Sequence, residues 1–237
     1  EILDTFYKAY DLAISGEPGP VFIEVPVNIQ LYTAAVEQPK TYQHYQAEQK
    51  EVSDLSGIAQ SQIDDAVDLL LYASSPGLFL GWGAVDVANE TMAIAEAIAA
   101  PASTTLQGLS AFPANHALHT GMSFGPAAVP VATKAFSNCD VMLAIGTRFG
   151  EIGTGSFGVS VPKNLIHIDI NPAVLNANYP ARIALEGDAK ILVPALLKSI
   201  HKRLESDTAL KETLATRKEV LVDLIKIQKE NYRDEWR

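Results

Sequence analysis

The sequence has 237 residues, of which 48% are hydrophobic, so it can bury one substantial core. A formal net charge of -10 and a pI of about 4.9 argue against nucleic acid as a partner, because a phosphate backbone needs a basic surface. No apolar run approaches the ~20 residues of a membrane span, no signal peptide is evident, and the single cysteine, Cys139, excludes an internal disulfide and indicates a reducing, cytoplasmic location.

The N-terminal segment predicts one helix and one strand. Residues 2–14 repeat apolar side chains at the spacing of an amphipathic helix, and residues 21–25, VFIEV, predict a buried strand that ends at Pro26. Residues 31–56 are rich in Gln, Glu, Tyr and Lys without a sustained period, which predicts a linker. One helix and one strand cannot bury their own apolar faces, so we expect this segment to pack against either the rest of this chain or a further domain.

Helices and strands alternate in the centre of the sequence. A capping-box pattern, Ser61 to Asp64, predicts the start of a helix that ends before the Ser-Pro pair at 75–76. The predicted strands are residues 78–80, 101–105, 141–146, 165–170 and 181–187, and the predicted helices between and after them lie near 86–98, 127–137 and 188–200. This alternation predicts an α/β fold with a doubly wound parallel sheet.

Residues 104–122, TTLQGLSAFPANHALHTGM, have neither a helical nor a strand period. Loops this long in compact domains are functional or disordered, and the apolar residues of this one argue against disorder. Right-handed crossovers place the carboxyl ends of all parallel strands at one edge of the sheet, where ligands bind. We therefore expect the loop to lie at a ligand-binding edge, with the segments that follow Leu80, Ile145 and Ile170.

Two glycine-rich stretches belong to that edge. GWGAVD resembles the start of a dinucleotide fingerprint, in which Gly81 and Gly83 let the backbone approach a phosphate; the alternative is a tight strand-to-helix turn that needs glycine. GTRFGEIGTGSFG (146–158) offers backbone N–H groups to a pyrophosphate, with Arg148 as a bidentate donor; the alternative is a flexible surface loop. Asp169 ends a predicted strand, where a carboxylate can accept hydrogen bonds from a ribose.

Other candidate residues predict structural roles. His116 and His119 form an HxxH pair without the further ligands of a metal site, so hydrogen bonding is favoured over metal binding. His167 is interpreted as a packed core histidine, and Cys139 as an unreactive thiol. The sequence therefore assigns no catalytic residue and no metal ligand to this chain.

The C-terminal tail predicts one or two helices. Apolar residues repeat at Leu210, Leu214, Leu221, Leu224 and Ile225, and the remaining face is heavily charged. We expect apolar faces of this tail and of helix 2–14 to be exposed and to promote self-association, for instance as a dimer.

Four stretches together resemble the acetolactate synthase family of thiamine-diphosphate-dependent enzymes. They are GEPGPVFIEVPVNIQ (16–30), TTLQGLSAFPANHALHTGM (104–122), AIGTRF (144–149) and IHIDINPAVLNANYPARIALEGDA (166–189). Their order and spacing also match the family. The resemblance covers nearly the whole chain and is specific in combination.

The resemblance implies a division into four parts. Residues 1–30 would be the end of the N-terminal pyrimidine-binding domain, 31–56 a linker, 57–204 the central domain, and 205–237 a helical linker toward a C-terminal diphosphate-binding domain. The central domain would be a six-stranded parallel sheet, Rossmann-like and similar to the NAD/FAD-binding fold of deoxyhypusine synthase. The chain would then be a fragment of a larger polypeptide.

The resemblance also implies where the chemistry lies. In the family, the N-terminal domain supplies the glutamate that activates thiamine diphosphate, and a GDG motif with a downstream asparagine in the C-terminal domain holds Mg²⁺. This sequence has no GDG triplet, so we expect the fragment to be inactive by itself. The parent would be a homo-oligomeric 2-keto-acid decarboxylase or carboligase, a transferase or lyase that acts on pyruvate or a similar acid.

In flavin-containing members of the family, FAD lies on the central domain and takes no part as a redox cofactor in the carboligation. The matching cofactor-binding positions are Gly81, Gly83, Thr105, Leu106, Gln107, Gly121, Met122, Gly146, Thr147, Arg148, Asp169, Ile170, Asp188 and Ala189. Because the residues after Arg148 depart from the flavin-binding pattern, FAD, ADP and no nucleotide stay open as alternatives. Without nucleotide, the domain would be a structural or oligomerisation module of an enzyme similar to oxalyl-CoA decarboxylase or glyoxylate carboligase.

Stand-alone relatives of the fold explain the sequence less well. A sirtuin-like NAD enzyme needs a pair of CxxC motifs for zinc, which one cysteine cannot supply. An electron-transfer flavoprotein domain does not explain GEPGPVFIEVP.

Overall fold

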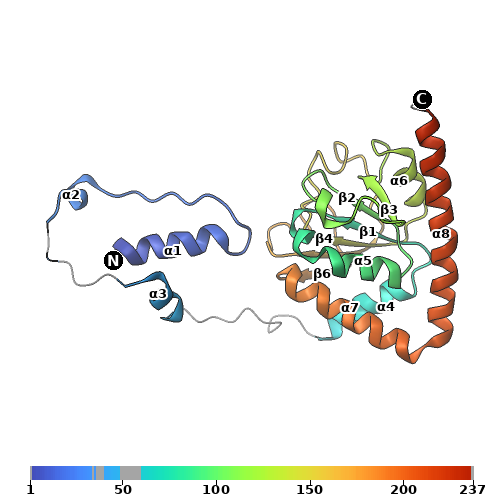
Figure 1. Ribbon diagram of the computed structural model, residues 1–237, viewed down its shortest axis with the longest axis horizontal. Coiled ribbons are helices and arrows are strands. Elements are labelled where there is room, and N and C mark those ends of the chain that lie inside the picture. The colour runs from blue at the N-terminus through green and yellow to red at the C-terminus, as the bar shows by residue number, and fades with distance from the viewer. Residues whose placement is uncertain (1, 34, 36–39, 49–59, 236–237) are drawn as a thin grey trace. The chain divides into compact units, whose positions relative to one another are not determined.

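The structure is a computed structural model that describes residues 2–33, 35, 40–48 and 60–235. The chain divides into two compact units, Glu1–Asp54 and Leu55–Arg237 (Figure 1). All strands of the described residues belong to the second unit. The predicted division at residues 30, 56 and 204 is finer than these two units and stays a prediction.

The described residues of the first unit form three short helices, α1 (Ile2–Ile14), α2 (Val27–Gln30) and α3 (Tyr42–Glu48). Helix α1 confirms the predicted amphipathic helix, but none of its residues is buried. Tyr7 of α1 packs its ring 5.4 Å from that of Tyr42 and 5.5 Å from that of Tyr45, and the Tyr42 hydroxyl donates to the Asp11 carboxylate. Aromatic contacts thus hold α3 against α1, although residues 31–56 predicted only a linker.

The predicted strand at residues 21–25 is wrong. The segment has no strand assignment, and Phe22 is 88% exposed. A strand needs a neighbour for its backbone N–H and C=O groups, and the described part of this unit contains no other strand. The apolar run is present, but it pairs with no strand among the described residues of this unit, and Ile23 and Val25 are only partly buried.

The second unit is built on a six-stranded parallel sheet, which confirms the predicted fold class. Its order is β3-β2-β1-β4-β5-β6, and every neighbouring pair is parallel. The strands are β1 (Pro76–Leu80), β2 (Ala102–Thr104), β3 (His119–Met122), β4 (Val141–Ile145), β5 (Asn164–Asp169) and β6 (Ile183–Glu186). The chain leaves β1 toward β2 on one side and β4 toward β5 on the other, as in Rossmann-like folds.

Strand β3 lies inside the segment that was expected to be irregular. It is a short edge strand whose register against β2 shifts between Ala102 and Ser103, and Gly121 in it has φ +107°. These irregularities hide the strand period from the sequence. The 3₁₀ turn η3 (Leu109–Ala111) precedes it.

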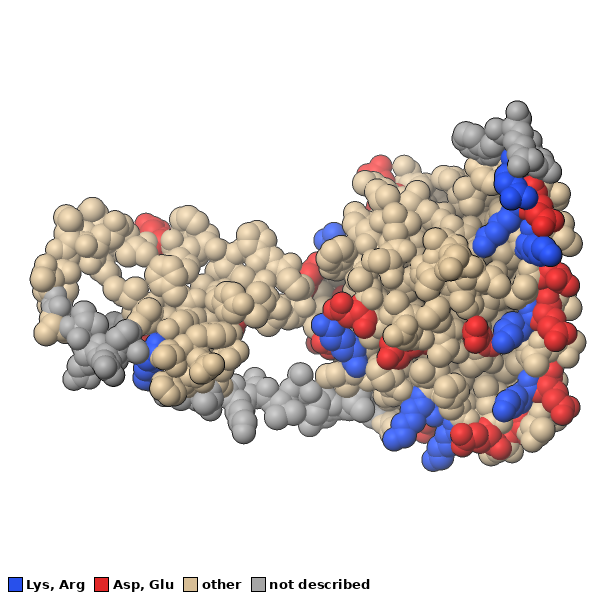
Figure 2. Space-filling model, viewed as in Figure 1, with Lys and Arg blue, Asp and Glu red and all other residues tan. Residues whose placement is uncertain are grey.

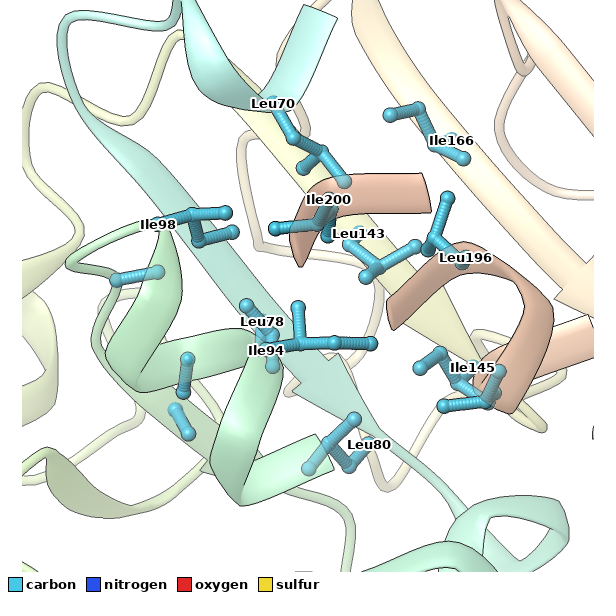
Figure 3. Close-up of a cluster of buried hydrophobic side chains, with 14 of the residues drawn as sticks. Leu70, Leu78, Leu80, Ile94, Ile98, Leu143, Ile145, Ile166, Leu196 and Ile200 are labelled. Carbon is cyan, nitrogen blue, oxygen red and sulfur yellow. The ribbon is translucent and has the colours of Figure 1, made fainter. Parts of the chain in front are cut away.

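One face of the sheet is covered by helices α4 (Gln60–Leu71), α5 (Ala88–Ala97) and α7 (Ala189–Ser206). Figure 3 shows the alternate strand residues that point to this face, including Leu78, Leu143 and Ile166, between helix residues such as Leu70 and Leu196. The 3₁₀ helix η2 (Trp82–Val87) leads from β1 into α5. Continuous apolar strands are expected of a parallel sheet that is covered on both faces.

The opposite face is packed largely by aromatic residues of the connections. The Phe79 ring on β1 lies 4.9 Å from that of Phe124 and 5.5 Å from that of Phe149. Phe136, directly after helix α6 (Pro130–Ala135), lies 5.3 Å from Phe124. The connections that follow β4 and β5 contain turns and no helix. Phe149 thereby anchors the glycine-rich connection to the sheet.

The helix ends agree only in part with the predicted caps. Helix α4 begins at Gln60, so Ser61 lies inside its first turn and the predicted capping box is wrong. Asp188 does cap α7, because its Oδ1 accepts a hydrogen bond from the Lys190 backbone N–H at 2.8 Å.

The tail forms the single helix α8 (Thr208–Glu235), drawn red along one side of the unit in Figure 1. Leu214 and Ile225 are buried in the main core, so the apolar stripe of α8 is not the exposed surface that we expected. The Arg217 guanidinium donates to the carbonyls of Ala73 and Ile98, which ties α8 to the ends of α4 and α5. The charged face of α8 is exposed, as expected.

Candidate functional site

All predicted cofactor-binding residues lie at the carboxyl edge of the sheet, in or directly after the ends of its strands. Parallel strands bring these positions, which are far apart in the sequence, to one edge. They are Gly81 and Gly83 after β1, Thr105, Leu106 and Gln107 after β2, Gly121 and Met122 in β3, Gly146, Thr147 and Arg148 after β4, Asp169 and Ile170 at β5, and Asp188 and Ala189 after β6.

Three glycines meet where the chain leaves β1 and β4. A Cβ on Gly146 would lie 2.3 Å from the Cα of Gly83, and a Cβ on Gly81 would lie 2.1 Å from the Gly146 carbonyl oxygen. The Gly83 N–H donates to that same oxygen at 3.2 Å. Contact between two backbones therefore requires these glycines, which supports the tight-turn interpretation of GWGAVD.

The connection after β4 folds as a series of ordered turns. Thr154, 1% exposed, donates through its hydroxyl to the Gly150 carbonyl at 2.9 Å. A Cβ on Gly153 would lie 3.4 Å from Cγ2 of Thr105, so this connection approaches the end of β2. Asn178 Nδ2 donates to the Arg148 carbonyl at 3.0 Å, while the Arg148 residue is exposed. The arginine thus stands on a fixed backbone at the edge.

His167, on strand β5, supports the backbone of the connection that follows β4. Its Nε2 donates to the Thr147 carbonyl at 2.9 Å, which fixes the tautomer because a carbonyl can only accept. Burial lowers the pKa of His167, although the Thr147 bond and the Asp169 charge oppose that shift. The ring is 1% exposed and packs at 5.3 Å against Phe149. The core interpretation is confirmed, and the histidine also positions the segment that carries Arg148.

The two acidic residues among the predicted cofactor-binding positions have structural hydrogen bonds. Asp169 Oδ1 accepts from the Asn171 N–H at 2.9 Å, and the Asp169 carbonyl accepts from the Gly187 N–H at 3.0 Å. The Asp188 carboxylate caps α7. Asp169 keeps its predicted place at the end of β5, whereas a helix N-terminus explains Asp188.

Large apolar side chains are exposed along the same edge. Trp82 is 67% exposed, Phe157 51% and Met122 41%. The full set is Trp82, Leu106, Leu109, Met122, Ile152, Phe157 and Ile170. Among these, Trp82, Leu109, Ile152 and Phe157 were not predicted as site residues; bulky apolar residues among the polar residues and glycines that follow strands are the sequence signal that identifies them. Several exposed apolar side chains on connections at one edge are consistent with a surface for an apolar ligand or for another protein.

The remaining candidates lie away from this edge. His116 Nε2 contacts Glu96 Oε1 at 3.1 Å, and His119 stacks on Phe112 at 6.1 Å. Burial raises the pKa of the Cys139 thiol to about 12. Across the described ranges, no group of three or more His, Cys, Asp or Glu residues is placed to hold a metal ion, and no helix has the length and hydropathy needed to cross a bilayer.

Sequence comparisons identify the second unit. Residues 63–196 match the profile of a family described as thiamine pyrophosphate enzyme, central domain. The acetolactate synthase isozyme 2 large subunit of Escherichia coli (strain K12) is 34% identical over 199 residues, which cover 82% of this chain and 34% of that protein. A probable acetolactate synthase large subunit of Methanocaldococcus jannaschii is 34% identical over 209 residues, or 84% of this chain and 34% of that protein.

A third relative, the acetolactate synthase large subunit of Corynebacterium glutamicum, is 32% identical over 208 residues, covering 84% of this chain and 31% of that protein. The chain therefore spans about a third of the length of these relatives. The resemblance drawn from the four stretches is confirmed. The chain belongs to the thiamine pyrophosphate enzyme family, and residues 63–196 are its central domain.

Proposed function

We propose that this chain is the central part of a thiamine-diphosphate-dependent 2-keto-acid decarboxylase or carboligase of the acetolactate synthase type. The similarity to three acetolactate synthase large subunits supports this proposal. When bound in the whole enzyme, thiamine diphosphate with Mg²⁺ supplies the chemistry that removes CO₂ from a 2-keto acid such as pyruvate and joins the remainder to a second carbonyl. Their binding residues would lie outside this chain.

The role of this domain would be to hold FAD or ADP at the carboxyl edge. The exposed apolar side chains there support the proposal most directly, because a flavin or adenine ring needs apolar surface on which to stack. Arg148 stands on a backbone fixed by His167 and Asn178, where a guanidinium can bind a diphosphate. Asp169 ends β5, where it can accept from a ribose hydroxyl.

A second candidate function is purely structural, in a domain that binds no nucleotide. The contacts of Gly81, Gly83 and Gly146 with one another and the capping role of Asp188 favour it, because none of them needs a ligand. The domain would then organise an enzyme similar to oxalyl-CoA decarboxylase or glyoxylate carboligase, with the apolar edge covered by protein.

The exposed apolar residues of α1, among them Phe6 and Tyr10, support assembly into a homo-oligomer. Light scattering tests this, since a monomer at high concentration would contradict it. The single cysteine, Cys139, supports a reducing, cytoplasmic location.

A chimaera tests the proposed reaction. The segment of the E. coli large subunit that aligns with residues 63–196 is replaced by these residues, and acetolactate formation from pyruvate is measured with thiamine diphosphate and Mg²⁺. We expect the chimaera to form acetolactate. A chimaera that assembles and melts like its parent but forms none would contradict the proposal. The same chimaera with Gly146→Val, whose side chain would meet Gly83, is the inactive control.

A further inference from the structure

A groove lies between residues 115–117 and the C-terminal half of α8, with a volume of about 390 Å³. It is far from the carboxyl edge along the strands: His116 contacts Glu96 near the end of α5, and Leu118, which precedes β3, accepts from the Ala102 N–H at the start of β2. The groove is therefore at the amino side of the sheet and separate from the proposed nucleotide site.

The groove has an apolar floor and a basic rim. Ala117, Val222 and Ile225 contribute the apolar surface, and Ile225 is only 1% exposed. Lys226, Lys229 and Arg233 line the rim at a spacing that places them on one face of α8. Figure 2 shows basic side chains gathered toward the C-terminal end of that helix.

The positive charge of the rim exceeds its negative charge. Glu230 is the acidic residue that lines the groove, and Glu96 beside it already contacts His116 at 3.1 Å. Within the part of the chain that the structure describes, no carboxylate lies within ion-pair distance of Lys226, Lys229 or Arg233. Three cations thus surround an apolar floor without paired anions.

The excess of positive charge at the groove affects the pKa of His119, which neighbours Lys229. Lys229 is partly buried, and burial lowers its pKa. His119 is 9% exposed, and its Nε2 has no hydrogen-bond partner among the described residues. Burial lowers the pKa of His119, and the charge of Lys229 lowers it further. An anion beside Lys229 would relieve this repulsion.

We propose that this groove binds a small organic anion, with a phosphate or carboxylate head against Lys226, Lys229 and Arg233 and an apolar body on Val222, Ile225 and Ala117. The volume lies in the range of small-molecule sites, and the combination of apolar floor and few charged groups is typical of them. An acidic peptide would satisfy the charges but not the apolar floor.

Histidine side-chain NMR of the 237-residue chain tests the proposal. The five histidines include His116 and His119 at the groove and His44, His167 and His201 elsewhere. Phenyl phosphate and phenylacetate are the probes for the two head groups. Phenol and inorganic phosphate are the separate halves of the first probe, and toluene and acetate are those of the second. We expect at least one of the two anions to shift only His116 and His119, and to bind at least about tenfold more tightly than either half.

Matched variants locate the binding. Lys229→Gln should weaken phenyl phosphate or phenylacetate about tenfold, and Lys226→Gln, at a more exposed position, should weaken it if Lys229→Gln fails to fold. Lys211→Gln, an exposed residue of α8 outside the groove, should leave the affinity unchanged.

Three results would overturn the proposal. One is the absence of shifts at His116 and His119 with millimolar probe. Another is inorganic phosphate or acetate that binds as tightly as the tighter of the two organic anions, or equal losses in Lys211→Gln and Lys229→Gln, which would mean an adventitious ion only. The third is a hexaglutamate peptide that binds more tightly than both organic probes, which would make the groove a protein-docking surface.

Discussion

Gly146 is the residue on which the geometry of the carboxyl edge depends most directly. Its φ is +57°, and a Cβ would meet the backbone of Gly83 at 2.3 Å. We predict that Gly146→Ala lowers the free energy of unfolding by at least about 2 kcal/mol, through backbone strain and overpacking. Urea denaturation measures this loss. Gly150→Ala is the matched control in the same connection, because no atom lies within 4 Å of its added Cβ. Equal stability of the two variants would show that the contact of Gly146 with Gly83 does not limit stability.

Arg148 tests the chemistry of the edge without disturbing its backbone. Its carbonyl, not its side chain, accepts the hydrogen bond from Asn178. Arg148→Ala should weaken FAD or ADP binding at least about tenfold, and it keeps the hydrogen bond from Asn178 because a backbone carbonyl accepts it. Isothermal titration calorimetry measures the affinity, with Lys163→Ala, an exposed residue at the opposite end of β5, as control. Unchanged titration curves for Arg148→Ala would remove this side chain from the site.

Arg217 connects helix α8 to the rest of the sheet unit, beside the buried Leu214 and Ile225. Its guanidinium donates to two carbonyls, and the residue is partly buried. Arg217→Met should lower the free energy of unfolding by about 1.5–3 kcal/mol, the range for hydrogen bonds to charged groups. Urea denaturation measures this, and amide exchange in α8 should accelerate.

Arg203→Met is the comparison for that variant. Arg203 pairs with Asp68 at 2.8 Å, but both side chains are substantially exposed. Such pairs contribute about 0–1 kcal/mol. If both arginine variants lose the same stability, α8 is not held by the buried hydrogen bonds of Arg217.

The helices and strands also show which sequence signals are sufficient to predict an element. Strand β4 and helix α7 follow from continuous apolar residues and from the Asp188 cap, because their local pattern and their burial agree. The sequence prediction is wrong for both strand β3 and residues 21–25, but in opposite ways: it missed the first strand and predicted the second where none forms. Pairing with β2 creates β3 from a segment without a period, whereas residues 21–25 have a strand pattern and no partner strand in their unit. Long-range pairing decides both, and no local pattern encodes it.

For the whole molecule, the sequence predicts the topology of the sheet more completely than it predicts the contacts within the candidate site. Alternating strands and helices place every predicted cofactor-binding residue at one edge, as found. The sequence could not show that Gly83 contacts Gly146 or that His167 supports Thr147, because these pairs are formed by adjacent parallel strands. Exposure of Trp82 and Phe157 likewise depends on the tertiary arrangement of the connections.

Two buried histidines predict a pH dependence of stability. Burial lowers the pKa of His119 and His167 in the folded state. The unfolded chain, with histidine pKa values near 6.5, therefore binds more protons below that pH, so stability is complete above about pH 6.5 and falls as the pH decreases. Urea denaturation at pH 7.5 and 5.5 should show this loss.

The histidine variants identify its source. His119→Gln and His167→Gln together should reduce the difference in stability between the two pH values, whereas His201→Gln, at an exposed position of α7, should preserve it. An undiminished difference in the double variant would assign the pH dependence to other groups.

We propose above that the carboxyl edge of this sheet is a nucleotide site. Calorimetric titration of the 237-residue chain with FAD, ADP and NAD shows whether it binds one. We predict micromolar binding of FAD or ADP and weaker binding of NAD, with FAD pointing to a flavin-containing acetolactate synthase and ADP alone to the oxalyl-CoA decarboxylase type. Absence of binding by both FAD and ADP would contradict the claim and leave the apolar edge as a surface that other protein covers.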